Sequence, residues 1–373
     1  MRIARYERAQ ANKNMEIKKI QDADVENKKV LLRVDFNVAT ENGKVKEKFK
    51  IEAAKETIKY LLEKKVKIAL ASHFGRPEGK KIPEYSLGKI AEDIGNILGV
   101  KTKFISDCVG QEVREGLQNI MAGEVLILEN VRFYSGDESN DGKFSKKLAE
   151  NFDIFVNDAF SVSHRDQASV TGVTKFLPSF AGFRLQKEIT EMEKIKNNFS
   201  RPAVAIIGGA KIETKLPVIK FFEEKYDYIL VGGKIANEAL DQGIKFSEKV
   251  ILPEDFVDDP VKSDETSDNG ASRLDIGPKT IEKFISIISG AKTVVWNGPT
   301  GKFEEEKYAV STEAILEAVI SSGAYSVVGG GETIEVLEKY SALARINFVS
   351  TGGGAMLTYL SGEPMPGILC LVD

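Results

Sequence analysis

The chain has 373 residues, which exceeds the size at which a single hydrophobic core usually stops growing, so the sequence predicts two domains. Its formal net charge of −4 argues against a general nucleic-acid or membrane surface, although it leaves room for a local basic pocket. No apolar run reaches the roughly 18 residues that a membrane helix requires. The cysteines Cys108 and Cys370 are few and far apart, which indicates a reducing compartment, and we therefore expect a cytoplasmic protein.

The first 14 residues are polar and contain no apolar stretch, which argues against a signal peptide. Residues 1–14 are interpreted as a disordered tail, with a targeting helix as the alternative because basic residues recur along them. We take the folded body to begin at Met15.

The first half of the body alternates apolar runs with amphipathic stretches. The predicted strands cover 29–36, 66–72, 101–105, 124–129 and 152–157, and the predicted helices cover 51–65 and 86–99. Such alternation is typical of βαβ units, in which helices cover both faces of a parallel sheet. This half is therefore predicted to be an α/β domain.

A charged segment over 186–198 has few apolar residues and is predicted to be a helix between two domains. After it, apolar runs end in glycine or a polar turn at 205–211, 229–234, 250–255, 294–301, 326–333 and 348–355. A strand that stops in glycine before a helix lets backbone amides approach a phosphate. The second half is therefore predicted to handle phosphate, and the polar stretch 258–273 is interpreted as an excursion within it.

The residues that follow each predicted strand indicate where ligands bind, because open parallel sheets hold ligands beyond the carboxyl ends of their strands. In the first half these residues are Asp35, Asn37, His73, Arg76, Asn130, Arg132, Asp158, His164 and Arg165. Guanidinium and imidazole groups can grip a small anion. A single strand-end arginine more often forms a surface ion pair, but the clustering after successive strands favours an anion site.

The second half offers glycines together with lysines and carboxylates. The residues that stand out are Lys211, Lys215, Asn297, Glu304, Glu332 and Thr333. This combination suits a nucleotide phosphate chain with magnesium, although each glycine turn alone could be a tight helix–sheet contact. The stretch GPTGK (298–302) is not a Walker A loop, because its spacing is short and Phe303 replaces the hydroxyl residue.

With these residues assembled, the chain resembles the phosphoglycerate kinase family from about Met15 onward. The shared motifs are RVDFNV (33–38), SHFGRP (72–77), LENVRF (128–133), NDAFSVSHR (157–165), LPSFAGF (177–183), GGAKIETK (208–215), DIGPKT (275–280), WNGPTGKFE (296–304), GGGET (329–333) and STGGGA (350–355). The resemblance implies two Rossmann-like parallel-sheet domains joined by a helical hinge, with the active site in the interdomain cleft. It also implies a Mg²⁺-dependent, in-line phosphoryl transfer that converts 1,3-bisphosphoglycerate and ADP into 3-phosphoglycerate and ATP on domain closure.

The resemblance also sets the expected domains and partners. The domains are 15–184 for 3-phosphoglycerate, 185–198 for the interdomain helix and hinge, 199–362 for the nucleotide, and a C-terminal segment, 363–373, that packs back on the first domain. Within this scheme 180–188 is the hinge candidate, with an ordinary helix start as the alternative. The expected partners are these phosphoglycerates and ATP or ADP, with no nucleic acid and no membrane, and the protein is expected to be a monomer.

Matching the motifs position by position implies roles for individual residues. The substrate residues would be Asp35, Asn37, Lys50, His73, Arg76, Arg132 and Arg165. The nucleotide residues would be Gly209, Lys215, Asn297, Glu304, Gly331 and Thr333, with Glu332 as the magnesium ligand. Lys211 would follow the transferring phosphoryl group, and Lys50, Gly353 and Gly354 would complete the catalytic positions. For His164 we expect a structural hydrogen bond.

Two departures from the family's pattern bear on the rate. Lys50 stands in place of an arginine, so it keeps the positive charge but lacks the planar guanidinium with its paired donors. Losing one such donor can cost about 2.7 to 4 kcal/mol of transition-state stabilisation. Glu332 stands in place of an aspartate, and magnesium demands tight octahedral geometry. These departures leave open a catalytically weakened relative that acts as a scaffold or sensor. A kinase for another carboxylic acid is a further alternative, which the three arginines disfavour because they suit a substrate with its own phosphate.

Overall fold

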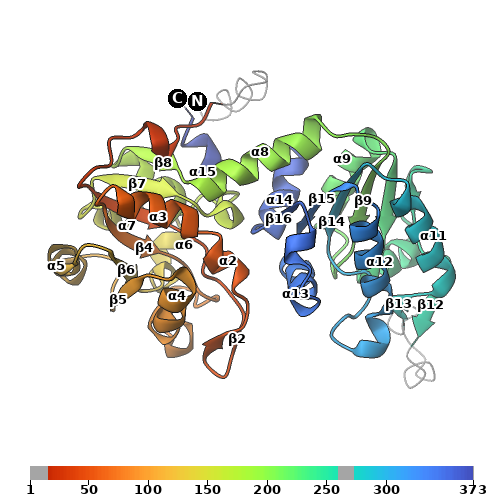
Figure 1. Cartoon of the computed structure of the whole chain (residues 1–373), viewed down its shortest axis with the longest axis horizontal. Helices are drawn as coiled ribbons and strands as arrows, with labels where there is room; N and C mark the ends of the chain where they lie inside the picture. The colour runs from red at the N-terminus through yellow and green to blue at the C-terminus, as the bar shows by residue number, and fades with distance from the viewer. Residues whose placement is uncertain (1–15, 259–272, 373) are drawn as a thin grey trace. The chain divides into compact units, whose positions relative to one another are not determined.

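The computed structural model describes residues 16–258 and 273–372, so the expected tail 1–14 and nearly all of the polar excursion lie outside the described residues. The chain divides into two compact units (Figure 1). Unit 1 contains the described residues up to Ile189 and those from Pro364 onward, and unit 2 runs from Thr190 to Glu363.

Unit 1 is built on a six-stranded parallel sheet in the order β5-β6-β4-β1-β7-β8. Its strands are β1 (Lys29–Arg33), β4 (Lys67–Ala71), β5 (Lys101–Ile105), β6 (Glu124–Leu128), β7 (Ile154–Asn157) and β8 (Ser179–Ala181). The chain builds the sheet on one side of β1 and then crosses to β7 on the other side. The loops after β1 and β7 therefore meet at the topological switch point, where ligands bind in such sheets.

Alternate residues of β1 face the two layers of helices that cover this sheet. Val30 and Leu32 belong to the hydrophobic cluster that includes α3 (Lys55–Glu63) and α4 (Ala91–Leu98). Leu31 belongs to the cluster that includes α5 (Gln111–Asn119) and α7 (Gly142–Ala149). Because side chains alternate along a strand, a continuous apolar run is what a sheet buried on both faces requires.

The predicted helices of this unit exist, but neither is one uninterrupted α-helix. The stretch 51–65 divides into α2 (Phe49–Glu52) and α3, because Ala54 N–H donates to Ile51 O in a tighter turn between them. The stretch 86–99 begins with a short 3₁₀ turn before α4. Strand β8 was not predicted, since it has only three residues and directly follows Pro178.

Unit 2 repeats the architecture with the strand order β11-β10-β9-β14-β15-β16, again parallel. Its strands are β9 (Ala203–Ile207), β10 (Tyr228–Val231), β11 (Val250–Ile251), β14 (Thr293–Asn297), β15 (Tyr325–Gly329) and β16 (Phe348–Ser350). When the six strands are numbered in chain order, this arrangement is 3-2-1-4-5-6, which is that of a doubly wound sheet. The switch point of the sheet therefore lies between β9 and β14. Two six-stranded parallel sheets confirm the predicted α/β fold class.

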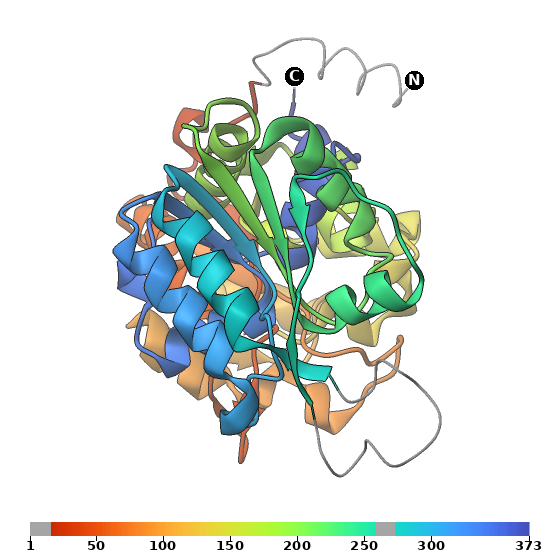
Figure 2. The ribbon, with the colours of Figure 1, turned by 90° about the vertical axis from the view of Figure 1, so that its right-hand side faces the viewer.

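The remaining elements cover the sheets or extend their edges. The helices are α6 (Ser135–Glu138), α9 (Leu216–Lys225), α10 (Gly233–Asp241), α11 (Pro278–Ser289), α12 (Val310–Ser321), α13 (Gly331–Lys339), α14 (Gly353–Leu360) and α15 (Pro366–Leu369). Helices α11 and α12 lie side by side in unit 2 (Figure 2). Two short antiparallel pairs, β2 (Thr40–Glu41) with β3 (Lys44–Val45) and β12 (Phe256–Asp258) with β13 (Arg273–Ile276), were not predicted.

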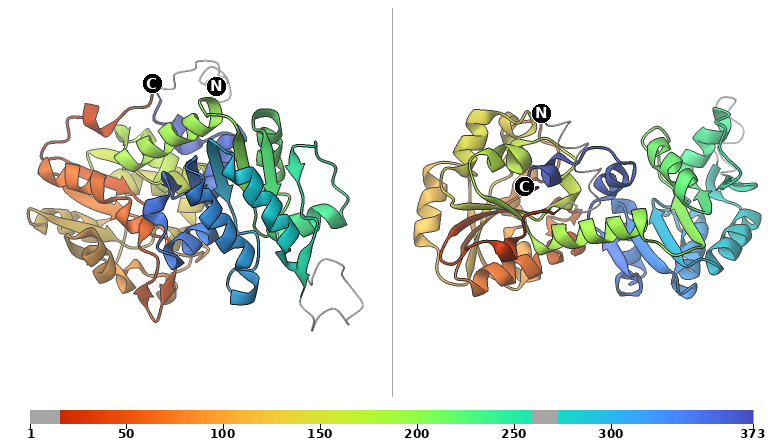
Figure 3. Two further views of the ribbon diagram at one scale, coloured as in Figure 1. Left: turned by 45° about the vertical axis from the view of Figure 1, so that its right-hand side comes forward. Right: turned by 90° about the horizontal axis from the view of Figure 1, so that it is seen from above.

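Helix α8 (Phe183–Asn197) is a single helix in which one unit ends and the other begins (Figure 3). Its start is fixed to unit 1, because Phe183 N–H donates to Thr57 Oγ1 at 2.9 Å and Leu185 N–H donates to Asp158 Oδ1 at 3.1 Å. The preceding Gly182 packs so closely that a Cβ there would lie 2.3 Å from Asp158 Oδ1. The hinge candidate therefore contains a tightly packed helix start.

The C-terminal segment lies in unit 1. Gly367 N–H donates to Ser163 O at 2.8 Å, and Asn157 Nδ2 donates to Gly367 O at 3.0 Å. Leu371 is buried, and its carbonyl accepts the backbone N–H of Lys18 at 2.9 Å. Among the residues that the structure describes, none of the helices combines the length and the apolar character needed to cross a membrane.

Candidate active site

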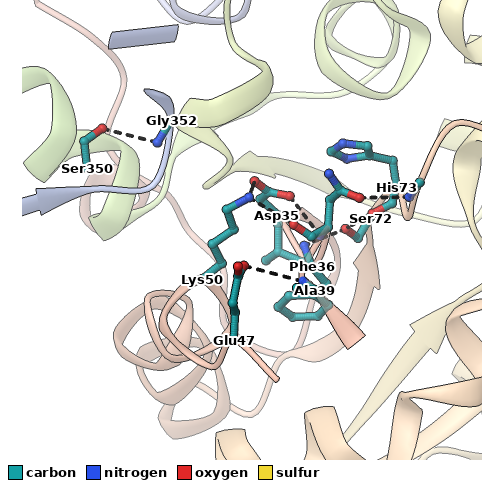
Figure 4. Close-up of polar contacts among 12 residues, drawn as sticks. Asp35, Phe36, Ala39, Glu47, Lys50, Ser72, His73, Ser350 and Gly352 are labelled. Atoms are coloured by element: carbon teal, nitrogen blue, oxygen red, sulfur yellow. Dashed lines mark hydrogen bonds and ion pairs between the residues drawn. The ribbon is translucent and has the colours of Figure 1, made fainter. Parts of the chain in front are cut away.

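The first group of site residues lies just beyond β1. Asp35 Oδ1 accepts the backbone N–H of Asn37 at 3.0 Å, and Asp35 Oδ2 lies 3.5 Å from Lys50 Nζ (Figure 4). Lys50 Nζ also donates to Asn37 O at 2.9 Å. Burial, the largest single influence, would raise the pKa of Asp35. The charge of Lys50, followed by the electrostatic influence of His73 and by hydrogen bonds from Ser161 and the backbone of Asn37, together hold that pKa well below its usual range. Asp35 is therefore a carboxylate that keeps Lys50 in place.

The loop after β4 is tied to this group. Asn37 Oδ1 accepts the backbone N–H of Gly75 at 2.8 Å, and Gly75 O accepts Arg132 Nη1 at 3.0 Å. Two of the predicted substrate residues, Asn37 after β1 and Arg132 after β6, are therefore linked through Gly75 in the loop after β4. His73 is buried nearby, and burial lowers its pKa well below the usual value; Asp35 opposes this shift, whereas positive charges including Arg132 add to it.

Arg132 has the donors that an anion would need. Its side chain is 3% exposed, yet Nε and Nη2 are buried without a hydrogen-bond partner among the described residues. Nε lies 3.5 Å from Glu138 Oε1, which is an ion pair and too long for a hydrogen bond of ordinary strength. Burial, followed by the charge of Arg165, lowers the pKa of Arg132. Because buried polar groups are almost always paired, these two donors indicate a place for a bound anion.

The other predicted residues of unit 1 are placed less uniformly. Arg165 is half-buried and donates through Nε to His164 Nε2 at 3.4 Å. Burial and the charge of Arg165 lower the pKa of His164 to about 4, so that imidazole is neutral; its structural role stays a prediction. Arg76 is exposed, and no hydrogen bond or ion pair joins it to any described residue.

Arg33, Ser169 and Asp137 were not among the predicted site residues. Arg33 ends β1 and is fully buried, with Nε donating to Ser169 Oγ at 3.2 Å. Asp137 is also fully buried and accepts Ser169 N–H at 2.9 Å. One indication of a role for Arg33 was present in the sequence, which is that it opens the RVDFNV motif. It was missed because a charged residue at a strand end is usually assigned to the protein surface.

The second group lies at the switch point of unit 2. Lys215 precedes α9, and its Nζ donates to Asn297 Oδ1 at the end of β14, while Asn297 Nδ2 donates to Gly329 O at 2.9 Å. Thr333 Oγ1 accepts the backbone N–H of Gly298 at 2.8 Å. The loops after β9, β14 and β15 are thus held together by the residues predicted to bind the nucleotide.

Two charged groups of unit 2 have shifted pKa values. Burial lowers the pKa of Lys215 to about 8, against the opposing charge of Glu332. Partial burial raises the pKa of Glu332, and the charge of Glu304 adds to the rise while Lys215 opposes it. A neighbouring cation would relieve the repulsion between the two carboxylates.

The glycines of this unit allow close backbone approach. A Cβ on Gly353 would lie 2.5 Å from Gly330 Cα, so the turns that begin α13 and α14 contact each other through glycine alone. Gly209 has a φ angle of +104°, which residues other than glycine rarely adopt. Gly331 is the first residue of α13, and the space around Gly354 is open. Lys211 and Glu304 are exposed after β9 and β14.

Comparison with known proteins identifies the family. The phosphoglycerate kinase family model matches residues 20–258 and 236–363. The phosphoglycerate kinases of Moorella thermoacetica and Pseudothermotoga lettingae are each 40% identical to this chain, over 95% of it and 98% of their own length.

Solved structures agree. The crystal structure of phosphoglycerate kinase from Pyrococcus horikoshii OT3 superimposes with a TM-score of 0.85 at 31% identity, covering 95% of this chain and 98% of that one. The structure of phosphoglycerate kinase from Coxiella burnetii gives a TM-score of 0.75 at 32% identity, over 95% and 99% of the two chains. The chain therefore belongs to the phosphoglycerate kinase family.

Proposed function

We propose that unit 1 binds 3-phosphoglycerate and that unit 2 binds the nucleotide of the phosphoglycerate kinase reaction. The activity follows from the family: the chain is a phosphoglycerate kinase of glycolysis, with ATP and ADP as co-substrates. The observation that carries the assignment to unit 1 is the pair of buried donors on Arg132 that have no hydrogen-bond partner among the described residues.

In unit 1 the proposed substrate residues are Asp35, Asn37, Lys50, His73, Arg76, Arg132 and Arg165. The buried guanidinium of Arg132 would hold the substrate's phosphate bidentately, with Arg165 beside it. Exposed Arg76 would turn toward the anion when it binds. Lys50 lies against Asp35, so it would present its ammonium from a fixed position.

In unit 2 the proposed nucleotide residues are Gly209, Lys215, Asn297, Glu304, Gly331 and Thr333. Lys215 would contact the phosphates, and the exposed carboxylate of Glu304 would accept hydrogen bonds from the ribose. Lys211 would accompany the transferring phosphoryl group toward the backbone amides at the start of α14. Gly353 and Gly354 have no side chains there, so the phosphoryl group could approach these amides closely.

The chemistry needs no general base. In the ATP-consuming direction the nucleophile is the substrate's own carboxylate, which is already ionised at neutral pH. The protein's task is to align it with the γ-phosphorus and to offset charge on the equatorial oxygens. Lysines, arginines and helix N-terminal amides are sufficient for that task.

Magnesium fits the residues of unit 2. We propose Glu332 as its ligand, because this carboxylate is paired electrostatically with Lys215 and repelled by Glu304. No group of three or more histidine, cysteine or acidic side chains that could hold a metal occurs among the described residues. Magnesium in phosphoryl-transfer enzymes typically uses one or two carboxylates together with substrate phosphates, so a single ligand is sufficient. When bound, it would neutralise charge on the phosphates.

Transfer would occur on closure of the two units about α8, because acceptor and donor residues belong to different units. The hinge at 180–188, a monomeric state and a cytoplasmic location stay predictions. Closure would also exclude water, which otherwise hydrolyses the acyl phosphate.

A coupled assay tests the function in both directions. The substrates are 3-phosphoglycerate and MgATP in one direction, and 1,3-bisphosphoglycerate and MgADP in the other. Turnover that saturates with both substrates is expected. Saturable binding of both ligands without turnover would instead support the scaffold alternative, and turnover with acetate would reveal a different acid as substrate.

A magnesium titration of Glu332→Asp tests the metal assignment. Aspartate removes one methylene, so we expect the magnesium concentration for half-maximal rate to fall by about two- to tenfold. The matched control is Glu335→Asp on the same helix. An identical titration curve for the Glu332 and Glu335 variants would contradict the assignment.

A further inference from the structure

Arg33 uses all three parts of its guanidinium within the protein. Nε donates to Ser169 Oγ at 3.2 Å, Nη1 donates to Val34 O, and Nη2 lies 3.4 Å from His73 Nδ1. The side chain is 0% exposed. Arg132, in contrast, keeps two donors without a hydrogen-bond partner among the described residues. Arg33 is therefore built to support other residues of the site.

The contact with His73 determines where the imidazole proton lies. A guanidinium has only donors, so the nitrogen that faces it must be an acceptor. His73 Nδ1 then carries the lone pair, and the proton of the neutral ring is on Nε2. If Nδ1 carried a proton, as it does in the other neutral tautomer and in the imidazolium, two N–H donors, Arg33 Nη2 and His73 Nδ1, would face each other with no acceptor between them.

The charges around His73 also favour the neutral ring. The groups that face it are Asp35 and Arg33 from β1 and the following loop, Arg132 after β6, and Arg165 after β7. Burial is the largest cause of its lowered pKa, and the three guanidiniums together oppose a further positive charge.

Arg33 is itself held by a buried network. Ser169, which accepts Arg33 Nε, donates its backbone N–H to Asp137 Oδ1 at 2.9 Å. Burial lowers the pKa of Arg33 to about 10, although the carboxylates of Asp137 and Asp35 oppose this shift, so the guanidinium stays charged at neutral pH. Helix α6, which carries Asp137, thereby fixes a side chain at the end of β1.

We propose that Arg33 is a positioning residue that holds His73 as its neutral Nε2–H tautomer, giving the substrate site of unit 1 a fixed hydrogen-bond donor. The link to the substrate rests on the proposed function. The donor is retained across neutral pH, so binding at this position does not depend on a proton being taken up or lost.

Nitrogen NMR of the full chain without substrate tests the tautomer directly. The chain has two histidines, so ¹⁵N labelling and one His164→Gln variant assign both rings. We expect the neutral Nε2–H pattern for His73 from about pH 6 to about pH 8. An Nδ1–H pattern or an imidazolium at neutral pH would overturn the proposal even if no variant folds.

Ser169→Ala tests the positioning role. Removing the acceptor of Arg33 Nε should let His73 mix its tautomers and should raise KM for 3-phosphoglycerate about two- to tenfold, with kcat and KM for ATP nearly unchanged. Ser145→Ala is the matched control, because Ser145 on α7 is also fully buried but donates to the carbonyl of Asp141, the residue before that helix. Equal spectra and equal KM values for the two variants would refute the role. A wild-type Nε2–H spectrum without any turnover of 3-phosphoglycerate would instead refute the proposed function.

Discussion

At the strand ends of unit 1 the groups suited to an anion are charged side chains, whereas in unit 2 many of them are backbone amides. In the first unit Arg132 is buried with two donors that have no hydrogen-bond partner among the described residues, and the buried Arg33 contacts His73. The second unit brings its turns together through glycines such as Gly330 and Gly353. Both sheets are six-stranded and parallel, so the difference lies in the loops.

The contrast teaches how one architecture can serve two anions. A buried guanidinium has a fixed, planar set of donors, which suits a small anion of defined shape. Backbone amides at helix N-termini can follow a longer phosphate chain, with lysines adding charge where it is needed. Substitutions in unit 1 should therefore affect recognition of the acid, and those in unit 2 should affect the nucleotide or the transfer itself.

The largest effect is expected for Lys211→Ala. Lys211 is exposed, and its ammonium forms no hydrogen bond or ion pair within the described part of the chain, so the fold should be retained. If it accompanies the transferring phosphoryl group, kcat should fall by about 10²- to 10³-fold while calorimetry still detects ADP binding. Lys220→Ala, an exposed lysine on α9, is the control. Undiminished turnover would refute the assigned role.

The second largest effect is expected for Arg132→Lys, which should distinguish binding of the acid in unit 1 from binding of the nucleotide in unit 2. Lysine keeps the charge but cannot present two fixed donors, so KM for 3-phosphoglycerate should rise about 10- to 100-fold with KM for ATP unchanged. Steady-state kinetics with each substrate varied in turn measures this.

The control for that substitution is Arg114→Lys, which alters an exposed pair with Glu150 in the same unit. If both KM values rise in Arg132→Lys, the residue supports the whole fold and the assignment of its donors to the acid is wrong.

A pH series compares the units without any substitution. Burial lowers the pKa of Lys215 to about 8, so this lysine is charged below that pH and loses its charge above it. KM for ATP should therefore rise by about two- to tenfold between about pH 7 and about pH 9. KM for 3-phosphoglycerate should stay flat, because His73 is neutral throughout. Lys215→Arg should remove the rise, whereas parallel changes in both KM values would contradict the comparison.

Much of this comparison could be predicted from the sequence because its signals are local. Apolar runs and the residues after them place Asp35 and Arg132 near strand ends and Lys215 in the segment after β9, and glycine-rich turns mark unit 2 as a site for phosphate. Those patterns depend on chain geometry that holds in any parallel sheet.

What could not be predicted depends on contacts between distant segments. The insertion of β6 between β4 and β5 follows from packing, which periodicity does not report. The burial of Arg33 required Ser169 and Asp137 to supply partners more than 100 residues away. Arg76, in contrast, was easily read from its motif but is exposed, because a motif gives no orientation to a side chain.

The smallest effect is expected for Lys50→Arg, which tests whether unit 1 is adapted to an ammonium. Lys50 lies 3.5 Å from Asp35 Oδ2 and donates to Asn37 O at 2.9 Å, with its side chain 17% exposed. A guanidinium has five N–H groups, so it can keep these contacts and offer a further donor to the phosphoryl group. Because lysine already supplies the positive charge and a donor, only the additional donor is gained, and we expect kcat to rise about two- to fivefold, measured against Lys48→Arg from the same segment. An unchanged or lower rate would contradict this expectation and would mean that the site compensates elsewhere for the planar guanidinium that Lys50 lacks.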